Sequence, residues 1–497
     1  MSQMTAERTP GNNQASAGSE GTRSRVLCID LDGTLVKTDT LHEALVSLLK
    51  RQPLMLFRLP GWIRLGRAGF KQKLAALVPT DASLLPYDLE ILGLIDQARS
   101  NGIKTCLVTG SDERVANAVA GYLGVFDEVF GSDGVNNLSG TGKAEFLERH
   151  YGRGCFTYAG NAQVDMVVWK SGGHAIVCNN SDSFCRKVET LAKVEAVIHP
   201  SGSFAGNALR ALRPHQWLKN LLVLVPLLTS HQLFAVRPMF HAMLAFAAFC
   251  CTASAVYICN DILDLDADRA HPRKKDRPWA AGELQIASAP MMIFALLLAA
   301  AGFSLRLPAG FSWILLLYLL LTLAYSLWLK RCMLVDVFVL AALYTIRLMG
   351  GGEASGIFLT PWLLIFSMFM FLSLALVKRY SEVYSVCNEE KAVIKGRGYL
   401  AADLDQLAVL GTSSGFLSVL VFALYVTSPE VKQLYHEPVL LLLACPLILY
   451  WVSRVWIIAR RGNMHDDPVL FALRDRISYL AAFGVAFIML LAKFLHS

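Results

Sequence analysis

The chain has 497 residues, of which 54% are hydrophobic, and it carries a formal net charge of +7 at pH 7. This length favours two domains, and the apolar content is high for a soluble protein. The cationic residues flank long apolar runs and form no basic stripe with interleaved aromatics, which argues against a nucleic-acid partner. The eleven cysteines show no CxxC pair or metal-ligand spacing, so we interpret them as reduced and structural.

Residues 1–24 are rich in Ser, Gly, Asn and Gln and lack an apolar segment. We expect a disordered tail and not a signal peptide, which leaves the following domain in the cytosol. From 25 to 200, short β-rich runs alternate with helical segments, which predicts a Rossmann-like α/β domain with a parallel sheet. The expected strands are 25–30, 103–109, 128–130, 155–159, 174–178 and 196–199.

The sequence VLCIDLDGTLVKTDT places Asp30 and Asp32 at the end of the first expected strand. Residues two apart in a strand point to the same side. Two carboxylates so placed can divide nucleophilic and acid/base duties around a bound Mg²⁺, which would neutralise the repulsion between a phosphate and the attacking carboxylate. This pattern therefore predicts phosphate chemistry at the carboxyl end of the strand.

The segment 41–94 has only helical pattern, and we expect it to form a helical cap over the site. Within it, PLMLFRLPGWIRLGRAGF mixes bulky apolar residues with Arg58, Arg64 and Arg67. Two interpretations stay open at this stage. The helix touches the membrane interface, or it is an ordinary cap helix that packs on its own domain.

Residues 25–200 resemble the haloacid dehalogenase superfamily of phosphatases, whose motifs occur here in order. VTGSD at 108–112 contains Thr109, similar to the family's phosphate-binding hydroxyl, followed by Gly110 and Ser111. Lys143 lies in GTGKAEFL, and Asp165 ends GNAQVD. These positions match the family's lysine and its acidic metal motif.

The resemblance implies that Asp30 is the nucleophile and forms an aspartyl-phosphate, while Asp32 acts as general acid/base. It also implies that Lys143 stabilises the charged intermediate and that Asp30, Asp32 and Asp165 surround Mg²⁺. One departure is Asn161, which stands where many members carry a first aspartate. With fewer acidic ligands we expect somewhat weaker metal binding.

After a linker or interfacial helix at 201–217, residues 218–497 alternate long apolar runs with short charged loops. Each run is about long enough to cross a hydrocarbon core as a helix. An N-terminus in the cytoplasm then puts the C-terminus outside and the charge-rich loops inside, which predicts a multi-pass protein of the inner (cytoplasmic) membrane. The nine runs are 218–235, 239–259, 287–305, 310–328, 334–350, 360–377, 406–426, 437–457 and 476–495.

The second run ends in Asn260, Asp261, Asp264 and Asp268, which follow the pattern NDxxDxxxD. This spacing stacks the side chains on one face of a helix, where the carboxylates repel each other unless a cation lies among them. We expect Mg²⁺ held by the three aspartates to bind a diphosphate. The alternative is a solvated loop with balanced charges. Basic residues that follow could hold further phosphate oxygens, namely Arg269, His271, Lys274, Lys275 and Arg277.

Residues 207–497 resemble the UbiA superfamily of intramembrane prenyltransferases, an all-α fold of nine transmembrane helices. LRPHQWLKN at 212–220, the NDxxDxxxDRAHPxKKxRPxAAG stretch and YSLWLKRCMLVDV at 325–337 resemble one branch, the decaprenyl-phosphate phosphoribosyltransferases. This resemblance implies transfer of 5-phosphoribose from phosphoribosyl diphosphate to a polyprenyl phosphate. It assigns catalysis to Asp261 and Asp264.

One departure from the commoner superfamily pattern favours that branch. The second acidic region has Asp336 alone where a DxxxD motif is expected, whereas cations suited to anionic phosphates are frequent. As phosphate-binding residues we expect the group Lys219, Lys330, Lys378 and Arg379.

The product of that transfer still carries a phosphomonoester, the substrate class of haloacid dehalogenase-type phosphatases. We therefore expect two consecutive steps in one chain, transfer followed by removal of the 5-phosphate. One alternative is a prenyltransferase that joins a polyprenyl diphosphate to an aromatic or other acceptor, with an independent phosphatase domain. Another is a channel, transporter or scaffold with an inactive soluble domain.

Overall fold

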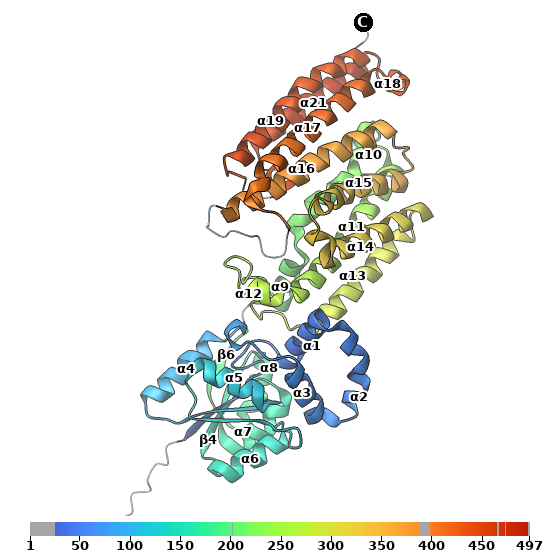
Figure 1. The fold of residues 1–497 in the computed structure, drawn as a ribbon. Coiled ribbons are helices and arrows are strands. Elements are labelled where there is room, and N and C mark those ends of the chain that lie inside the picture. Colours follow the sequence, from blue (N-terminus) through green and yellow to red (C-terminus); the bar gives the residue numbers. More distant parts are fainter. Residues whose placement is uncertain (1–24, 201, 388–397, 465–466, 473, 496–497) are drawn as a thin grey trace, which may run out of the picture. The chain divides into compact units, whose positions relative to one another are not determined.

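The computed structural model describes residues 25–200, 202–387, 398–464, 467–472 and 474–495. The chain divides into two compact units, Met1–Ser201 and Gly202–Ser497. The first is an α/β unit, and the second consists of helices (Figure 1). Each unit is described by itself below.

The first unit contains one parallel sheet in the order β3-β2-β1-β4-β5-β6. All six expected strands are present. The central strand β1 has β2 on one side and β4 on the other, so the strand order reverses there. Ligands of such sheets bind at the carboxyl ends of the strands beside this reversal. The bounds are β1 Val26–Ile29, β2 Thr105–Asp112, β3 Glu128–Ser132, β4 Phe156–Gly160, β5 Gly173–Cys178 and β6 Lys193–Ile198.

Helices cover both faces of this sheet, as the buried apolar strands of a parallel sheet require. On one face, Ile95 and Ala116 from two helices pack with Ile29 of β1. On the other, Leu147 and Trp169 pack with strand residues. The helices are α4 Leu89–Ser100, α5 Glu113–Leu123, α6 Thr141–Tyr151, α7 Met166–Gly172 and α8 Asp182–Glu189.

A helical insert follows β1 and has a small core of its own, formed around Leu48, Leu74 and Val78. Its first helix begins after Asp39, whose side chain accepts a hydrogen bond from the Leu41 amide at 2.8 Å. The sequence predicts one helical cap over 41–94, but the only helical element in residues 78–88 is the short turn η2, and the last part belongs to α4, which packs on the sheet. A capping role for the insert stays a prediction. The insert contains α1 Thr40–Arg51, η1 Pro53–Arg58, α2 Leu59–Ile63 and α3 Gly66–Leu77, followed by the short turn η2 Ala82–Leu84.

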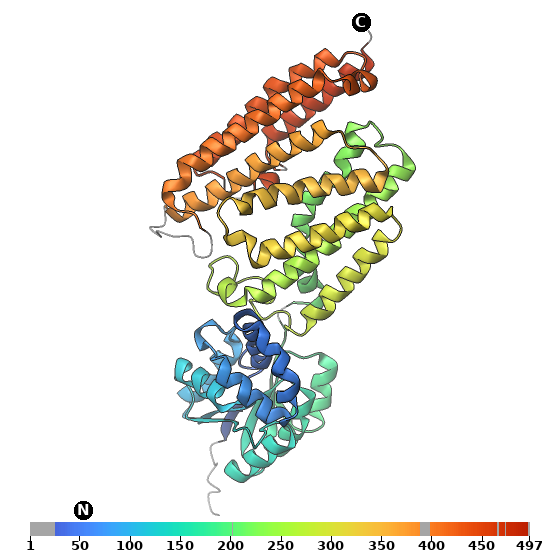
Figure 2. The ribbon, with the colours of Figure 1, turned by 45° about the vertical axis from the view of Figure 1, so that its right-hand side comes forward.

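The second unit is helical, and its long helices run beside one another (Figures 1 and 2). The elements up to residue 355 are α9 Phe204–Leu212, η4 Pro214–Leu224, α10 Val225–Thr229, α11 Val236–Leu263, α12 Leu265–Arg269, α13 Ser288–Ser304, α14 Ala309–Leu327, η5 Leu329–Arg331 and α15 Val335–Ser355. The others are α16 Pro361–Cys387, η6 Ala401–Asp403, α17 Leu404–Val426, α18 Pro429–Leu434, η7 Pro438–Leu443, α19 Ala444–Arg460, α20 Pro468–Ala472 and α21 Arg476–Phe494.

Seven helices in the described part of the chain are long and apolar enough to cross a membrane. The expected count of nine is therefore not confirmed. The run 218–235 does not form one helix but the 3₁₀ helix η4 and the short α10, with Pro226 at the start of α10. Proline lacks the amide donor that a continuing helix needs. The run 287–305 forms α13, whose 17 residues span about 26 Å, slightly less than a typical hydrocarbon core.

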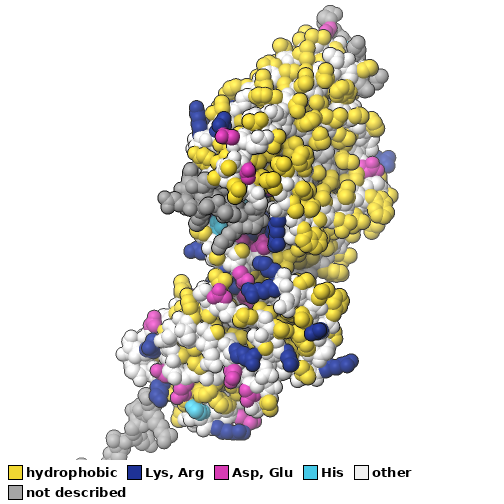
Figure 3. All heavy atoms as spheres, viewed as in Figure 1, with side chains coloured by type: hydrophobic (Ala, Val, Ile, Leu, Met, Phe, Trp, Pro, Cys, Tyr) yellow, Lys and Arg dark blue, Asp and Glu magenta, His cyan; other side chains and the backbone are white. Residues whose placement is uncertain are grey.

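The face of the helical unit that Figure 3 shows is largely apolar. Phe294, Trp313 and Phe483 are 69%, 71% and 72% exposed, although each is a large hydrophobic side chain. Such a continuous apolar exterior is unfavourable in water and favourable in lipid. The chain is therefore a multi-pass membrane protein.

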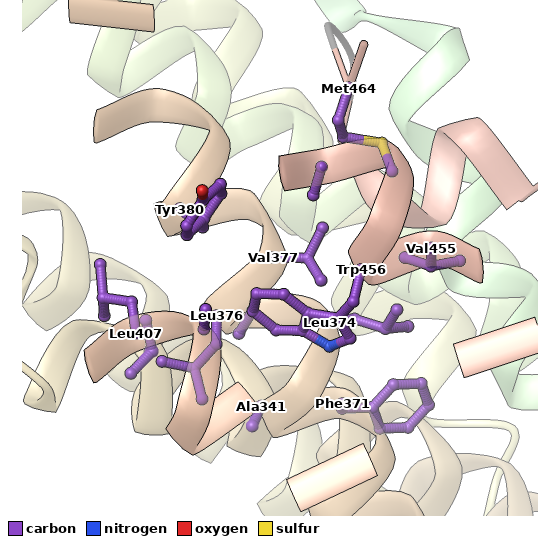
Figure 4. Packing of buried hydrophobic residues seen from close by; sticks show 14 of the residues in the cluster. Ala341, Phe371, Leu374, Leu376, Val377, Tyr380, Leu407, Val455, Trp456 and Met464 are labelled. Atoms are coloured by element: carbon purple, nitrogen blue, oxygen red, sulfur yellow. The ribbon is translucent and has the colours of Figure 1, made fainter. Parts of the chain in front are cut away.

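The interior of this unit is packed around Trp456 of α19 (Figure 4). Its indole donates a hydrogen bond to the Ser373 hydroxyl of α16 at 3.0 Å. A Cβ at Gly411 of α17 would lie 1.9 Å from the indole ring, so only glycine permits this approach. Close packing here holds α16, α17 and α19 together.

Candidate active sites

The first site lies where β1 ends. The Oδ1 atom of Asp30 accepts hydrogen bonds from the Lys143 ammonium and the Leu31 amide, both at 2.9 Å. Asp30 and Lys143 are 9% and 2% exposed. Because these bonds use Oδ1, they leave Oδ2 of Asp30 as the oxygen that can attack.

Asp32 is connected to the carboxyl end of β2. Its Oδ2 accepts a hydrogen bond from the Ser111 hydroxyl at 2.6 Å, and its Oδ1 accepts one from the Thr40 amide at 2.7 Å. The Ser111 amide in turn donates to the Thr109 hydroxyl at 3.0 Å. The fold thus brings Asp32, Thr109, Gly110 and Ser111 together, since β1 and β2 are neighbours in the sheet.

Asp165 is connected to Asp30 through Lys143 and Tyr158, and Tyr158 is a residue that sequence reasoning missed. The Tyr158 hydroxyl accepts a hydrogen bond from Lys143 at 2.7 Å and donates one to Asp165 at 3.0 Å. The other Asp165 oxygen accepts from the amides of Asn161 and Ala162 at 3.3 and 3.0 Å. A buried aromatic residue in a strand is ordinary core, so no signal in the sequence separated Tyr158 from it.

The buried position of Asp30 predicts a pH dependence. Burial raises the pKa of Asp30 from its ordinary 3.8 to about 6, even though the Lys143 ammonium opposes the rise. Only the ionised carboxylate is a nucleophile, so phosphatase kcat/KM is expected to fall as the pH drops through about 6. The Asp30 pKa is 3.8 in the unfolded chain and about 6 in the folded chain. Between these pH values the folded state binds more protons than the unfolded state, so the free energy of unfolding should decrease as the pH rises through this interval.

A pH profile of phosphomonoester hydrolysis by the full-length protein, taken at several Mg²⁺ concentrations, checks this. Because a cation favours the charged form of a carboxyl, more Mg²⁺ should move the acid limb to lower pH. A rate that stays constant between pH 7 and pH 5 at low Mg²⁺ would contradict the expected protonation of Asp30.

Gly33 in the turn after Asp32 predicts a second measurable effect. Its φ of +73° is rarely adopted by other residues, and an added Cβ would lie 2.0 Å from the side-chain nitrogen of Asn161. Gly33→Ala should therefore lower the free energy of unfolding by about 2 kcal/mol or more, with a lower melting temperature. It should also reduce the rate of phosphomonoester hydrolysis. Gly102→Ala is the matched control, because Gly102 has φ +69° but nothing within 4 Å of its Cβ position. Equal effects of the two variants would show that only the backbone angle matters.

The second site lies at the end of α11, and its local structure corrects one expectation. Asp261, Asp264 and Asp268 do not share one continuous helix, because α11 ends at Leu263 and α12 begins at Leu265. Asp264 is the break, with φ −103° and ψ 15°. Asp261 and Asp268 nevertheless stay close, since Arg277 donates to both carboxylates.

A second arginine, Arg213, also pairs with Asp261. Both arginines contact the Oδ1 atom, whereas Oδ2 of Asp261 is buried and has no hydrogen-bond partner in the described part of the chain. Asp264 is more open, with its side chain 40% exposed and its Oδ2 3.5 Å from the Lys330 ammonium. The acidic cluster is thus surrounded by the expected cations Arg277 and Lys330.

Three other candidates for phosphate binding in this stretch, Arg269, Lys275 and Asn260, are placed differently. Arg269 donates from Nε to the Ala280 carbonyl at 3.0 Å, which holds the loop 270–280 against α12. Lys275 is exposed, and Asn260 is half-buried in the last turn of α11. Roles in phosphate binding for these three residues stay predictions.

Lys219 and Lys378 meet at Asp467, a second residue that sequence reasoning missed. The Asp467 carboxylate lies 2.7 Å from Lys219 and 3.2 Å from Lys378, and its side chain is 9% exposed. Burial raises the pKa of Asp467, but Lys378 and Lys219 outweigh it and hold that pKa well below its usual range. The available signal was the run HDDP between two apolar segments, at the end of the unit where basic residues gather.

Arg379 and Asp336 form a separate, fully buried ion pair. Both side chains are 0% exposed, and Arg379 also pairs with Glu382. The Tyr399 hydroxyl donates to Asp336 at 2.6 Å. The expected group of four cations is therefore divided. Lys219 and Lys378 meet at Asp467, Lys330 lies near Asp264, and Arg379 has its own protein partners. Its binding of a phosphate stays a prediction.

Mg²⁺ prefers oxygen ligands, and both sites provide them. Asp30 has one oxygen without a described hydrogen bond, and Asp261 has a buried one. Among the described residues, no three His, Cys, Asp or Glu side chains are grouped closely enough to hold a metal ion by themselves. The donor chemistry fits Mg²⁺ provided that substrate oxygens or water complete the ligand shell, as is usual for this ion.

Comparisons with known proteins agree with the two units. The sequence model of the UbiA prenyltransferase family matches residues 223–491, which is more than half of the chain, and that of the haloacid dehalogenase-like hydrolases matches residues 27–154. The chain belongs to the UbiA prenyltransferase family and carries a haloacid dehalogenase-like domain before the membrane helices.

Three relatives show how far the likeness extends. Protein y4nM of Sinorhizobium fredii is 37% identical over 94% of this chain and 91% of that protein. Nodulation protein NoeC of Azorhizobium caulinodans is 33% identical over 56% of this chain and 90% of its own length. Decaprenyl-phosphate phosphoribosyltransferase of Mycobacterium tuberculosis is 29% identical over 58% of this chain and 94% of its own length.

Proposed function

We propose that this chain is a bifunctional membrane enzyme. Its helical unit transfers 5-phosphoribose from phosphoribosyl diphosphate to a polyprenyl phosphate, with Mg²⁺ at the acidic cluster. Its N-terminal domain, with a second Mg²⁺, then removes the 5-phosphate to give polyprenyl-phosphoryl ribose. The name of the mycobacterial relative supports the first step, and the hydrolase-like domain supports the second.

The observation that carries the transferase proposal is the buried ion pair of Asp336 and Arg379. A prenyl donor of the commoner superfamily pattern needs a second acidic motif, and Asp336 is fully buried and already paired. That leaves a single acidic cluster in the described part of this unit, at the end of α11. One such cluster suits one diphosphate, which a phosphoribosyl donor carries on its sugar.

The acceptor is a monophosphate on an isoprenoid chain, and the unit offers a matching environment for each part. Lys219 and Lys378 provide two ammonium groups within reach of one anion. A cavity of about 860 Å³ with mostly apolar walls lies among α16, α19 and α21, and its apolar lining suits an isoprenoid chain. In this proposal an oxygen of the lipid phosphate attacks the anomeric carbon as the diphosphate leaves toward Asp261 and Asp264.

In the phosphatase step, Oδ2 of Asp30 attacks the phosphorus and the sugar oxygen leaves. Asp32 protonates that oxygen and later takes a proton from the water that hydrolyses the aspartyl-phosphate. Lys143 faces the charge that develops beside Asp30. Because both steps occur in one chain, the product meets the phosphatase at high effective concentration.

The domain limits and the orientation belong to the same proposal. The phosphatase domain comprises 25–200, and its cap is the part of 41–94 that precedes α4. Residues 201–217 connect the phosphatase domain to the transferase domain, 218–497. In this proposal the phosphatase domain lies on the cytoplasmic side of the inner membrane and the C-terminus outside, which the positive-inside bias of the loops supports. Both substrates then react at the cytoplasmic face.

One experiment tests the reaction class. Purified protein is incubated with Mg²⁺, polyprenyl phosphate and labelled phosphoribosyl diphosphate, and in parallel with a labelled prenyl diphosphate and an aromatic acid. We expect label in the lipid fraction only from the phosphoribosyl donor, and mass spectrometry should show polyprenyl-phosphoryl ribose. Incorporation from the prenyl donor alone would refute the proposal in favour of aromatic prenyl transfer.

A further inference from the structure

The helical insert of the N-terminal domain exposes large apolar side chains that do not pack in its own core. Leu54, Phe57, Ile63 and Leu65 are 79%, 84%, 64% and 56% exposed. Their neighbours Met55, Leu56, Leu59 and Trp62 instead pack inward on the small core around Leu48, Leu74 and Val78. The segment from η1 to the start of α3 therefore has two apolar faces, of which only one is covered.

The same insert is strongly basic. No Asp or Glu occurs between Glu43 and Asp81. Arg58, Arg64 and Arg67 are exposed, and the structure records no ion pair for them among the residues that it describes. Figure 3 shows basic and apolar side chains side by side over α1–α3. The basic residues of the insert are Lys50, Arg51, Arg58, Arg64, Arg67, Lys71 and Lys73.

We propose that this surface, Leu54, Phe57, Arg58, Ile63, Arg64, Leu65 and Arg67, docks on an anionic lipid surface. Apolar side chains that enter the interface, with arginines at headgroup level, are the features of a segment that lies in the membrane plane. The complete lack of acidic residues matches a negatively charged surface and would be unusual for a protein interface of mixed charge. A lipid surface is always present, because the same chain spans the membrane.

Docking also has a structural link to the phosphatase site. Lys71 of α3 donates a hydrogen bond to the Gly110 carbonyl at 2.7 Å, at the carboxyl end of β2 between Thr109 and Ser111. A lipid-bound insert would thereby be held against this end of the strand. The docking itself does not depend on which reaction the two sites perform.

Hydrogen exchange of the full-length protein in lipid nanodiscs, one protein per disc, tests the proposal. We expect amides of residues 53–67 to exchange about tenfold more slowly in discs that contain anionic phosphatidylglycerol than in zwitterionic discs. High salt should reduce this difference, because it screens exposed charges. Exchange that is equal in the two lipids would overturn the proposal.

Two variants separate the contribution of the arginines to lipid docking from that of the apolar side chains. Both variants change exposed side chains, so folding should be unaffected. Arg58→Glu/Arg64→Glu/Arg67→Glu should abolish the dependence on anionic lipid, and Leu54→Ser/Phe57→Ser should remove most of the protection in either lipid. The matched control is Arg99→Glu/Lys104→Glu/Lys170→Glu, which changes the same charge on exposed positions outside the insert and should keep full protection. Protection that persists in the arginine variant, or that appears in detergent only at high protein concentration, would assign the surface to a protein contact and overturn the proposal.

Discussion

An Asp30→Asn variant of the full-length protein is expected to form the phosphoribosylated lipid but to leave its 5-phosphate in place. The amide of asparagine is not a nucleophile, so no aspartyl-phosphate can form, and hydrolysis should fall by about a thousandfold or more. The substitution preserves size at a buried position. Lys143 also keeps its hydrogen bond to Tyr158, so we expect the domain to stay folded.

Mass spectrometry of the lipid product, together with a melting curve, measures this outcome. Asp96→Asn is the matched control, because Asp96 is an exposed aspartate of α4 in the same domain. The control should yield the dephosphorylated lipid. If Asp30→Asn also yielded it, the N-terminal domain would not be the phosphatase of this product.

An Asp264→Asn variant is expected to produce no glycolipid at all, with a loss of transfer of about a hundredfold or more. Asp264 is the most accessible carboxylate of the cluster, and its only described side-chain partner is Lys330 at 3.5 Å. Neutralising it would therefore remove a proposed ligand of the Mg²⁺ that binds the diphosphate, without leaving a buried charge unpaired. The same change at Asp261 would leave Arg213 and Arg277 without their shared anion, which would confuse chemistry with stability.

The control for this variant is Asp266→Asn, two residues along the chain and half-exposed in α12. Transfer is measured over a Mg²⁺ titration, where a lost ligand should raise the concentration needed for half-maximal rate. Asp264→Asn should still hydrolyse a soluble phosphomonoester at the normal rate, since Asp30 is untouched. Normal glycolipid formation by this variant would remove the acidic cluster from the mechanism.

Taken together, the two variants separate the two reactions. Asp30→Asn should block only the second step, and Asp264→Asn should block only the first. A variant that lost both activities would instead indicate misfolding or a shared site, and its melting curve would distinguish these.

Much of the fold was predictable from local patterns. The alternation of β-rich and helical runs predicted all six strands, since periodicity and turn residues act within a few positions of one another. The order of Asp30, Thr109, Lys143 and Asp165 predicted that they lie at one edge of the sheet, because the carboxyl ends of parallel strands meet there. Apolar runs likewise predicted the seven helices in the described part of the chain that are long and apolar enough to cross a membrane, whereas α13 is shorter than expected.

Local patterns were insufficient where contacts join distant segments. Helical spacing predicted three stacked carboxylates, but the backbone turns at Asp264, and Arg277 instead brings Asp261 and Asp268 together. Apolar length predicted a first span, yet Pro226 and the 3₁₀ geometry of η4 interrupt it.

The sequence by itself determined the two-part organisation, the sheet and the chemical groups present at each site, because these follow from composition, periodicity and short motifs. Only the tertiary structure decided which charges meet. It placed Asp467 between Lys219 and Lys378, paired Asp336 with Arg379, and placed Tyr158 between Lys143 and Asp165. The physical reason is that a buried charge needs a partner, and the partner is whichever group the packed helices or strands bring near, at any distance along the chain.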